Sequence, residues 1–338
     1  MKYLSPTTFI KFLNCQHHVK LLKVDKVLGE EVDGQTMAMA TGTAFDILVK
    51  SALNRRFKLT ELLDQKIKKE NKAAIQVATE LWEAYKEGPV SCLKDEGIGY
   101  GGIDQETEIE YNYCKTCGGH CKLTSDRQFY IDDNGDAINT EKERAIGFTH
   151  DVRQYKSVLY GMPDLTLTDG TVLDWKVSGA FSSKGATPRP GYSRCWVYGV
   201  SNVFHGKDQG DDCSHLSLEV VNRDWAIQIY LYARLLGHTP GRQLRGGVEN
   251  VCVSKDNTIY CASYRNTITP EFQREIELKF HKAFAALNNG TTENPIYGEY
   301  RCKQYNKVCN VADYCSAYKS AIKGVPSPQC NGTTLLNL

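Results

Sequence analysis

The chain has 338 residues and a formal net charge of +1, from 41 basic and 40 acidic side chains. This balance excludes a protein that binds a polyelectrolyte through bulk charge, so binding to nucleic acid would need a local basic groove. Hydrophobic residues are 41% of the chain, and no apolar run approaches the length of a membrane span. We therefore expect a soluble globular protein with no membrane partner.

Thirteen cysteines are a high and odd number for a chain in which no secretion signal is recognised. In such a chain they indicate metal or cluster ligation rather than a disulfide framework. We therefore expect a reducing, cytoplasmic location.

The N-terminal part, residues 1–100, is expected to be helical. Ser5 as a cap and Pro6 in the first turn predict the start of a helix over residues 5–24. An apolar stripe runs along this helix, and Cys15 falls beside it.

A second helix is predicted over residues 42–53, where Gly42 permits close backbone approach and Asp46 follows one turn later. Residues 59–87 predict a long charged helix or a pair of helices that ends at Gly88. We interpret the lysines of this stretch as a solvated face.

The segment 114–158 is interpreted as an insertion that follows a strand over residues 108–113. It opens with a C-x₂-C-x₃-C knuckle whose glycines allow the tight turn of a tetrahedral thiolate site. The cysteines of the knuckle are Cys114, Cys117 and Cys121. They indicate zinc, with Cys92 as a candidate fourth ligand; the alternative is a flexible insertion with free thiols. The rest of the segment predicts an embellished hairpin.

The stretch 160–179 predicts the hairpin around which the chain is organised. An Asp-Gly turn at 169–170 lies between alternating apolar residues, which is a strong signal for a β-hairpin. The two strands are expected over residues 164–168 and 171–177.

The hairpin carries the residues that indicate chemistry. Asp164 begins one strand, while Asp174 and Lys176 share a face of the other and Trp175 points the opposite way. Two carboxylates beside a lysine suit Mg²⁺ or Mn²⁺. The alternative is a turn residue plus a surface ion pair, but the apolar flanks indicate a buried strand, which does not carry a charged pair without a reason.

A long Gly/Ser/Pro-rich stretch, 178–214, is expected to be a loop. Its basic residues, interleaved with aromatic ones, suit a strand of nucleic acid through charge and stacking. The candidate DNA-binding residues are Lys184, Arg189, Tyr192 and Arg194. The alternative is a disordered surface loop.

Residues 223–236 predict a helix capped at Asn222, with Gln228 and Tyr232 on one face because they are four residues apart. Such a pair occurs at core edges as well as in sites. Later elements are predicted as strands over 249–253 and 258–264 and a helix from 269 to 287.

The C-terminal segment, 300–338, holds a C-x₆-C-x₅-C pattern formed by Cys302, Cys309 and Cys315. With Cys15 as a fourth thiolate, these cysteines would bind a [4Fe–4S] cluster and tie the N-terminal helix to the C-terminus. Zinc is the alternative occupant, and buried cysteines without a metal are the third interpretation.

Taken in order, these motifs resemble the RecB-like branch of the PD-(D/E)XK nuclease superfamily. That branch includes the CRISPR-associated iron–sulfur exonucleases, and phage-encoded single-domain members are the most similar in kind. The matching positions are Cys15, Gly42–Asp46, Asp164, Asp174-Trp175-Lys176, Gln228–Tyr232, and Cys302, Cys309 and Cys315. Two features depart from the pattern: Asp46 stands where the family has histidine, and the family's C-x₂-C-x₅-C is C-x₆-C-x₅-C here.

The resemblance implies one α/β domain over residues 1–338 with a restriction-endonuclease-like core, a central mixed sheet flanked by helices, and catalytic residues within 160–265. It implies a metal-dependent deoxyribonuclease, expected to be an exonuclease of DNA recombination, repair or processing, that acts on single-stranded DNA or duplex ends. No ATP-binding P-loop motif occurs, so any unwinding would come from a helicase or recombination partner.

The same resemblance assigns roles to the site residues. Asp164 and Asp174 would hold Mg²⁺ or Mn²⁺, helped by the Trp175 carbonyl and Asp46. Lys176 would orient the attacking water or stabilise phosphate charge, and Gln228 and Tyr232 would position DNA. The competing interpretations are a catalytically silent nucleic-acid-binding or assembly protein, and a zinc-dependent DNA-binding module built on residues 114–121.

Overall fold

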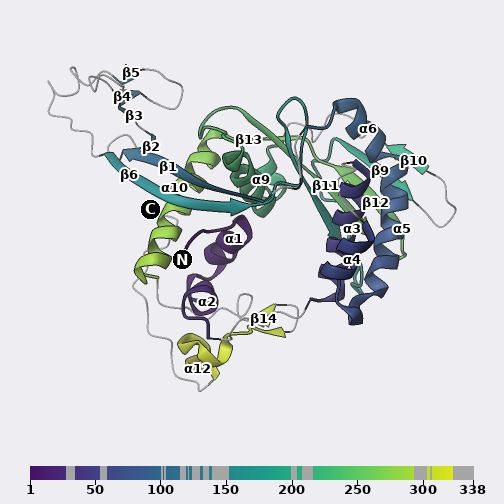
Figure 1. The fold of residues 1–338 in the computed structure, drawn as a ribbon, viewed down its shortest axis with the longest axis horizontal. Coiled ribbons are helices and arrows are strands. Elements are labelled where there is room, and N and C mark those ends of the chain that lie inside the picture. Colours follow the sequence, from purple (N-terminus) through teal and green to yellow (C-terminus); the bar gives the residue numbers. More distant parts are fainter. Residues whose placement is uncertain are drawn as a thin grey trace.

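The computed structural model describes residues 1–27, 35–53, 59–99, 102, 104–114, 119–120, 122–123, 130–131, 137–138, 152–198, 204–207, 216–292, 303–304 and 307–322. In this part of the chain the fold is mixed α/β, with a mixed β-sheet flanked by helices (Figure 1). None of its helices is long and apolar enough to cross a membrane.

The main sheet has the strand order β10-β9-β12-β11-β8-β7, with β13 paired to β11. Only the β8–β11 pair is parallel among the described pairings, so the expected mixed sheet is confirmed. In chain order the strands are β7 (Leu165–Thr166), β8 (Val172–Ser178), β9 (Arg194–Tyr198), β10 (Phe204–Lys207), β11 (Leu244–Val253), β12 (Ile259–Ser263) and β13 (Asn266–Ile268).

The predicted hairpin is confirmed as β7–β8, which lies at one edge of the main sheet. Its turn follows from local chemistry. Gly170 adopts a φ of +86°, which glycine tolerates, and the Asp169 carboxylate accepts a hydrogen bond of 2.9 Å from the Thr171 backbone N–H.

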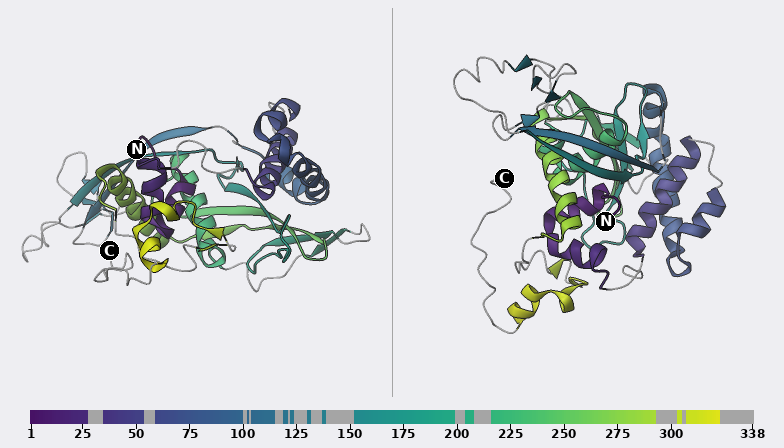
Figure 2. Two further views of the ribbon diagram at one scale, coloured as in Figure 1. Left: turned by 90° about the horizontal axis from the view of Figure 1, so that it is seen from below. Right: turned by 60° about the vertical axis from the view of Figure 1, so that its left-hand side comes forward.

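Helices cover both faces of this sheet, as expected. On one face lie α1 (Pro6–Asn14), α9 (Arg223–Leu235) and α10 (Pro270–Asn289), and on the other α3 (Met37–Leu53) and α5 (Ala73–Glu87). Alternation along β8 divides its side chains between the two cores: Val172 packs with the α9 group, and Leu173 and Trp175 pack with the α3 group. Figure 2 shows α3 and α5 apart from α1 and α10.

A second, long ribbon is formed by β1 (Gln105–Cys114) and β6 (Val152–Gly161), paired antiparallel along their full lengths. The expected strand at 108–113 is thus confirmed and is longer than predicted. The ribbon packs on α10, where the Tyr111 ring stacks 6.0 Å from the His281 ring. At its far end lie the short strands β2 (Gly119–His120), β3 (Lys122–Leu123), β4 (Tyr130–Ile131) and β5 (Ala137–Ile138) (Figure 1).

The single helix expected over residues 5–24 is wrong. The chain leaves helical geometry at Cys15, whose φ and ψ are −157° and 102°, and the Cys15 sulfur accepts a hydrogen bond of 3.4 Å from the His18 backbone N–H. The cysteine therefore caps a new helix. The elements here are α1, α2 (Gln16–Val19) and a π-helical turn (Lys20–Val24).

The neighbouring helical predictions need smaller corrections. Helix α3 begins at Met37 rather than at Gly42, and a Cβ placed on Gly42 would have no atom within 4 Å, so the expected close approach at this glycine is wrong. The stretch 59–87 is a pair of helices, which confirms the second of the two predicted alternatives. It comprises α4 (Leu59–Lys66), a 3₁₀ turn (Lys69–Asn71) and α5, and after Gly88 comes the unexpected α6 (Pro89–Glu96).

The loop expected over residues 178–214 is wrong in its second half, which contains β9 and β10. The run Arg194–Tyr198 is rich in aromatic and β-branched residues, and it pairs with β12 inside the sheet. The first half is a loop, but a packed one. A Cβ on Gly179 would lie 2.1 Å from the Val253 carbonyl oxygen, which requires glycine at this contact.

The later elements follow the prediction closely. Asn222 caps α9 by accepting from the backbone N–H groups of Asp224 and Trp225, and Thr269 caps α10, which ends at left-handed Gly290. The remaining described elements are α8 (Leu218–Val221), β14 (Lys303–Gln304), β15 (Lys307–Val308), a 3₁₀ turn (Ala312–Tyr314) and α12 (Ser316–Ile322).

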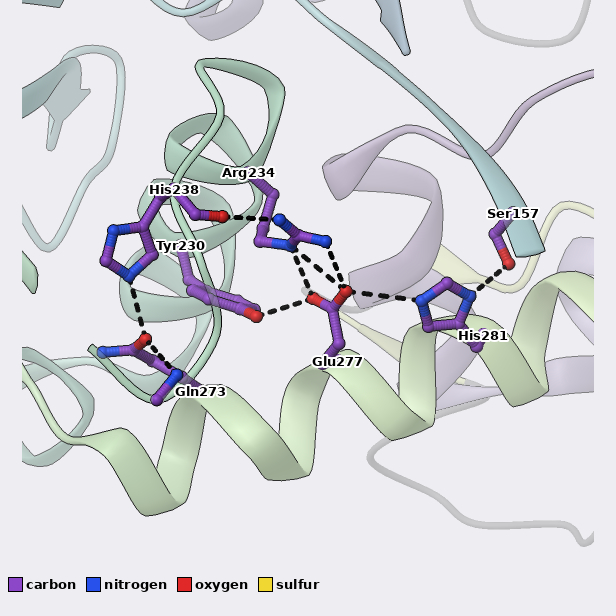
Figure 3. A network of polar contacts seen from close by, with 8 residues as sticks. Ser157, Tyr230, Arg234, His238, Gln273, Glu277 and His281 are labelled. Atoms are coloured by element: carbon purple, nitrogen blue, oxygen red, sulfur yellow. Dashed lines mark hydrogen bonds and ion pairs between the residues drawn. The ribbon is translucent and has the colours of Figure 1, made fainter. Parts of the chain in front are cut away.

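A buried ionic network fastens α9 to α10 (Figure 3). The fully buried Glu277 carboxylate accepts hydrogen bonds from Tyr230 Oη at 2.6 Å and from Arg234 Nε and Nη2 at 2.9 to 3.1 Å. His281 contacts Glu277 at 3.3 Å and Ser157 of β6 at 2.7 Å. Tyr230 and Arg234 lie on the face of α9 that is opposite to Gln228, so this network fixes the helix from behind.

Charge compensation keeps Glu277 ionised inside the core. Burial alone would raise its pKa, but the His281 and Arg234 side chains outweigh burial and hold the pKa at about 2, against an ordinary value of 4.5. A group with a lowered pKa in the folded state stabilises the fold above its unfolded pKa. This contribution is lost as the pH falls from 4.5 toward about 2.

We expect Glu277→Gln to lower the free energy of unfolding by about 3–5 kcal/mol near neutral pH, because it leaves Arg234 as a buried charge without a counter-ion. Urea denaturation would measure this. The matched control is Glu275→Gln on the same helix, whose partly exposed pairs with Arg223 and Lys279 should contribute at most about 1 kcal/mol. Equal losses in the two variants would contradict the prediction.

Candidate active site

Seven polar side chains from three separate parts of the chain meet at the β7–β8 edge of the sheet, and we refer to them as the acid–lysine cluster. They are Asp46 and Lys50 of α3, Asp164, Asp174 and Lys176 of the hairpin, and Gln228 and Tyr232 of α9. Six of these were predicted from the sequence, and Lys50 was not.

On the α9 side, Gln228 ties the hairpin residues together. Its Oε1 accepts from Lys176 Nζ at 2.8 Å, and its Nε2 donates to Asp174 Oδ1 at 3.0 Å and to the Tyr232 hydroxyl at 2.9 Å. Lys176 Nζ lies 2.5 Å from Asp174 Oδ2. The expected shared face of Asp174 and Lys176 is therefore confirmed.

On the α3 side, Lys50 joins two acids. Its Nζ donates to Asp46 Oδ2 at 2.9 Å and to Asp164 Oδ1 at 2.8 Å. The other oxygen of Asp164 accepts from the Trp175 backbone N–H at 3.1 Å. Both oxygens of Asp164 thus have a donor.

Trp175 links the cluster to the core behind it. Its backbone lies between Asp174 and Lys176 on β8, so the carbonyl that was expected to help hold a metal belongs to the same stretch of strand. Its ring points to the other face, where the indole N–H donates to the Tyr85 hydroxyl at 2.9 Å. The predicted orientation of Trp175 is confirmed.

Lys50 had only a weak signal in the sequence. An acid followed four residues later by a lysine is an ordinary exposed helix pair, and nothing local distinguishes Asp46 and Lys50 from one. The difference is that the Lys50 side chain is only 8% exposed and its second partner, Asp164, is 114 residues away.

The charges of the cluster are poorly compensated. Burial, with the neighbouring Asp164 carboxylate, raises the pKa of Asp46 to about 7 against the effect of Lys50. Burial likewise raises the pKa of Asp174 to about 7, with Lys176 opposing and Asp164 adding to the rise. Three carboxylates face two ammonium groups, so the cluster favours one further positive charge.

The donor chemistry fits a hard divalent ion. Asp46 Oδ1 and Asp174 Oδ2 are buried and accept no hydrogen bond, although a lysine ammonium lies close to each. Carboxylate oxygens of this kind are the ligands that Mg²⁺ prefers. Among the described residues, however, no three His, Cys, Asp or Glu side chains converge on one point. The lysines lie among the acids instead.

The four candidate DNA-binding residues have different surroundings. Lys184 lines an open cavity of about 580 Å³ together with Lys255. Arg189 places its guanidinium 5.9 Å from the Trp225 ring centroid, and Tyr192 packs edge-on against Tyr264. Arg194 of β9 donates to the sulfur of Cys92, the candidate fourth zinc ligand, at 3.1 Å.

The cysteines predicted to bind a cluster are described in part. Cys15 and Cys309 are half-buried and Cys315 is buried, whereas Cys302 lies outside the described residues. His18, three residues after Cys15, hydrogen-bonds with Asn310, the residue after Cys309, at 2.9 Å. In Figures 1 and 2, α12 correspondingly lies near α2.

The cysteine knuckle is largely outside the described part of the chain. Cys117 and Cys121 are not among the described residues, and Cys114 is the last residue of β1. Residues 132–136, within the hairpin expected in the same segment, also lie outside them.

Comparisons with known proteins add little. No protein-family model matches the sequence, and no curated protein matches it. A solved structure titled "Crystal structure of SSO0001" aligns with 91% of this chain and 96% of its own, at 11% sequence identity and a TM-score of 0.28. A TM-score this low carries no argument about fold or function.

The raised pKa of Asp174 gives a testable cost in stability. A carboxyl whose folded pKa lies above its unfolded value of 3.8 destabilises the fold progressively as the pH rises through that interval toward about 7. We therefore expect Asp174→Asn to be more stable than the wild type by about 1–3 kcal/mol at about pH 8, with a smaller gain at about pH 5. Thermal and urea denaturation at both pH values would measure the difference.

The control for this experiment is Asp169→Asn in the turn of the same hairpin. The backbone N–H of Thr171 lowers the pKa of Asp169, so its substitution should give no gain at high pH. A gain in Asp174→Asn that does not depend on pH would contradict the prediction.

Proposed function

We propose that the chain is a metal-dependent deoxyribonuclease and that the acid–lysine cluster is its active site. One observation carries the proposal: Asp174 and Lys176 of the hairpin are bonded to Gln228, 52 residues beyond Lys176, while Asp164 accepts a hydrogen bond from the Trp175 backbone N–H that lies between them. The proposal includes a restriction-endonuclease-like core built on β8, with α3 and α9 on its two faces. It rests on the order of the sequence motifs together with this arrangement.

Asp164 and Asp174 would hold Mg²⁺ or Mn²⁺, with Asp46 and the Trp175 carbonyl as further ligands. The buried oxygens Asp46 Oδ1 and Asp174 Oδ2 support this assignment, because each already lies beside a cation, the ammonium of Lys50 at 2.8 Å or that of Lys176 at 2.5 Å. When bound, such an ion lowers the pKa of a water molecule toward about 7 and polarises the phosphate.

In this proposal Lys176 acts on the reacting groups. Its side chain is 30% exposed, so the ammonium can reach a bound phosphate while it remains anchored by Gln228. In hydrolysis a water oxygen attacks phosphorus, the ester P–O bond breaks, and the leaving oxygen takes up a proton. Lys176 would orient the water or stabilise the charge on the five-coordinate phosphorus.

Gln228 is a positioning residue in this proposal. It accepts from Lys176 and donates to Asp174, so it sets the separation of the ammonium and the carboxylate. Tyr232 supports Gln228 from the next turn of α9, and its hydroxyl stays protonated because burial and the neighbouring Asp174 raise its pKa. Both residues would help to position DNA.

DNA is the proposed substrate, as single strands or duplex ends, with a helicase or recombination partner for any unwinding. Lys184 and Lys255, which line the same cavity, supply positive charge beyond the C-terminal end of β8. Positive charge of this kind would bind the phosphate backbone of DNA, although Asp256 also lines this cavity.

The proposed function predicts that Lys176→Ala cleaves end-labelled DNA about 10²–10⁴-fold more slowly than the wild type, because the group that stabilises phosphate charge is lost. Anaerobically purified protein would be assayed with Mn²⁺ or Mg²⁺ on single- and double-stranded DNA. Lys156→Ala is the matched control, since Lys156 is exposed on β6 and pairs with Glu108 and Glu110.

Each outcome of this assay separates the alternatives. Equal cleavage by wild type and Lys176→Ala would place the active site elsewhere. Retained DNA binding without cleavage by either protein would favour the catalytically silent binding protein.

We also propose that Cys15, Cys302, Cys309 and Cys315 bind a [4Fe–4S] cluster, with zinc as the alternative metal. The contact between His18 and Asn310 supports it, because it brings the neighbours of Cys15 and Cys309 together. A shared cluster would hold α2 and the C-terminal segment in that contact.

We expect Cys315→Ser to lose the iron content and visible absorption of the anaerobically purified protein, because one thiolate ligand is removed. The control is Cys252→Ser, which alters a buried cysteine of β11. Metal content that is the same in both variants and the wild type would contradict the assignment, and zinc in place of iron would identify the other occupant.

A further inference from the structure

Lys50 occupies the place of a cation between two of the proposed metal ligands. Its Nζ lies 2.8 Å from Asp46 Oδ1 and 2.8 Å from Asp164 Oδ1. These contacts come from different parts of the chain, one on the same helix and one at the start of the hairpin. The ammonium therefore joins α3 to the hairpin.

This lysine is held as a charged group although it is buried. Its side chain is 8% exposed, and two carboxylates, those of Asp46 and Asp164, lie 2.8 Å from its Nζ. Lys50 therefore differs from a solvent-exposed lysine, because both its side chain and its charged end are enclosed by the protein. Its function in this structure is to neutralise the two carboxylates.

A divalent ion and the Lys50 ammonium compete for the same oxygens. Mg²⁺ binds carboxylate oxygens at about 2.1 Å, which leaves no room for a second cation between the same pair. Asp164 illustrates the conflict, because its Oδ1 is bonded to Lys50 and its Oδ2 to the Trp175 backbone N–H. A metal ion can coordinate Asp164 Oδ1 without competition only after the Lys50 ammonium has moved away from that oxygen.

We propose that Lys50 is a tethered cation that holds Asp46 and Asp164 together when no metal is bound, and that it gives up this place when Mg²⁺ or Mn²⁺ enters. The arrangement explains why three acids remain close at the β7–β8 edge while no three of the described ligand-type side chains converge on one point. It also makes Lys50 a positioning residue that sets the affinity of the site for metal. This inference rests on the metal site of the proposed function.

The test is calorimetric titration of Mn²⁺ into protein without DNA, for the wild type, Lys50→Met and Lys176→Met. We expect Lys50→Met to bind Mn²⁺ at least about tenfold more tightly than the wild type, equivalent to about 1.4 kcal/mol. Lys176→Met removes the same charge but leaves the Lys50 contacts with Asp46 and Asp164 in place, and the Lys176 side chain is more exposed, 30% against 8%. It should therefore tighten binding by a smaller factor.

The proposal is overturned if Lys50→Met binds Mn²⁺ no more tightly than the wild type, or if Lys176→Met tightens binding equally. Equal effects would mean that Lys50 has no role that distinguishes it from Lys176, which pairs with Asp174. A crystal structure with Mn²⁺ gives a second readout: the ion should contact Asp164 Oδ1 while Lys50 Nζ lies beyond hydrogen-bonding distance. Bound Mn²⁺ with Lys50 still joining the two acids would also overturn the proposal.

Loss of Lys50 could unfold the protein, because two buried carboxylates would face each other. The double variant Lys50→Met/Asp46→Asn retains the wild-type net charge and addresses this risk. It should still bind Mn²⁺ more tightly than Asp46→Asn alone, because only the double variant lacks Lys50 and so releases Asp164 Oδ1. Equal affinity of these two variants would count against the proposal.

The outcome is distinguishable from that of the proposed function. If the wild type binds Mn²⁺ and Lys50→Met binds it more tightly, the inference stands even when neither cleaves DNA. If the wild type cleaves DNA but Lys50→Met shows no gain in affinity, the function stands and the inference fails.

Discussion

The gathering of one buried and two partly buried carboxylates at one edge of a β-sheet is the constraint around which this structure is arranged. Asp46, Asp164 and Asp174 come from a helix, a strand entry and a strand interior, and each meets a lysine or a backbone donor. Unpaired charges in such a place would be costly, so their surroundings must supply compensation. Lys50 and Lys176 supply most of it, and one negative charge remains when all five groups are ionised.

Precise placement of these groups depends on the two helices that cover the sheet. Helix α9 presents Gln228 to Asp174 and Lys176 on one face, while its opposite face is fixed to α10 through Arg234 and Glu277. The ionic network of Figure 3 thus lies in the core and acts on the cluster only through the rigidity of α9. Helix α3 has the corresponding role on the other side, where Lys50 reaches Asp164.

The cluster lowers the stability of the fold, because it holds ionisable acids with raised pKa values away from water. The raised pKa values of Asp46 and Asp174 indicate that the lysines compensate the burial of these acids only in part. Sites with perturbed acids are enriched among functional sites, because catalysis uses groups that the fold leaves incompletely compensated. A bound cation would relieve the same strain that the lysines relieve in part.

The sequence by itself determined the elements whose signals are local. Asp169 and Gly170 specify the β7–β8 turn, Asn222 caps α9, and Thr269 and Gly290 bound α10, since each of these contacts lies within a few residues of the chain. The hairpin pattern also placed Asp174 and Lys176 on one face. For these features the physical cause is a contact between residues of the same short segment.

Only the tertiary structure decided the rest. Residues 194–198 became a strand because β12 pairs with them, and Cys15 interrupts the first helix. The place of Lys50 follows from the packing of α3 against the hairpin, which brings together residues 114 positions apart. No local pattern distinguishes such a lysine from one on a solvated helix face, because its second carboxylate partner exists only after the chain has folded.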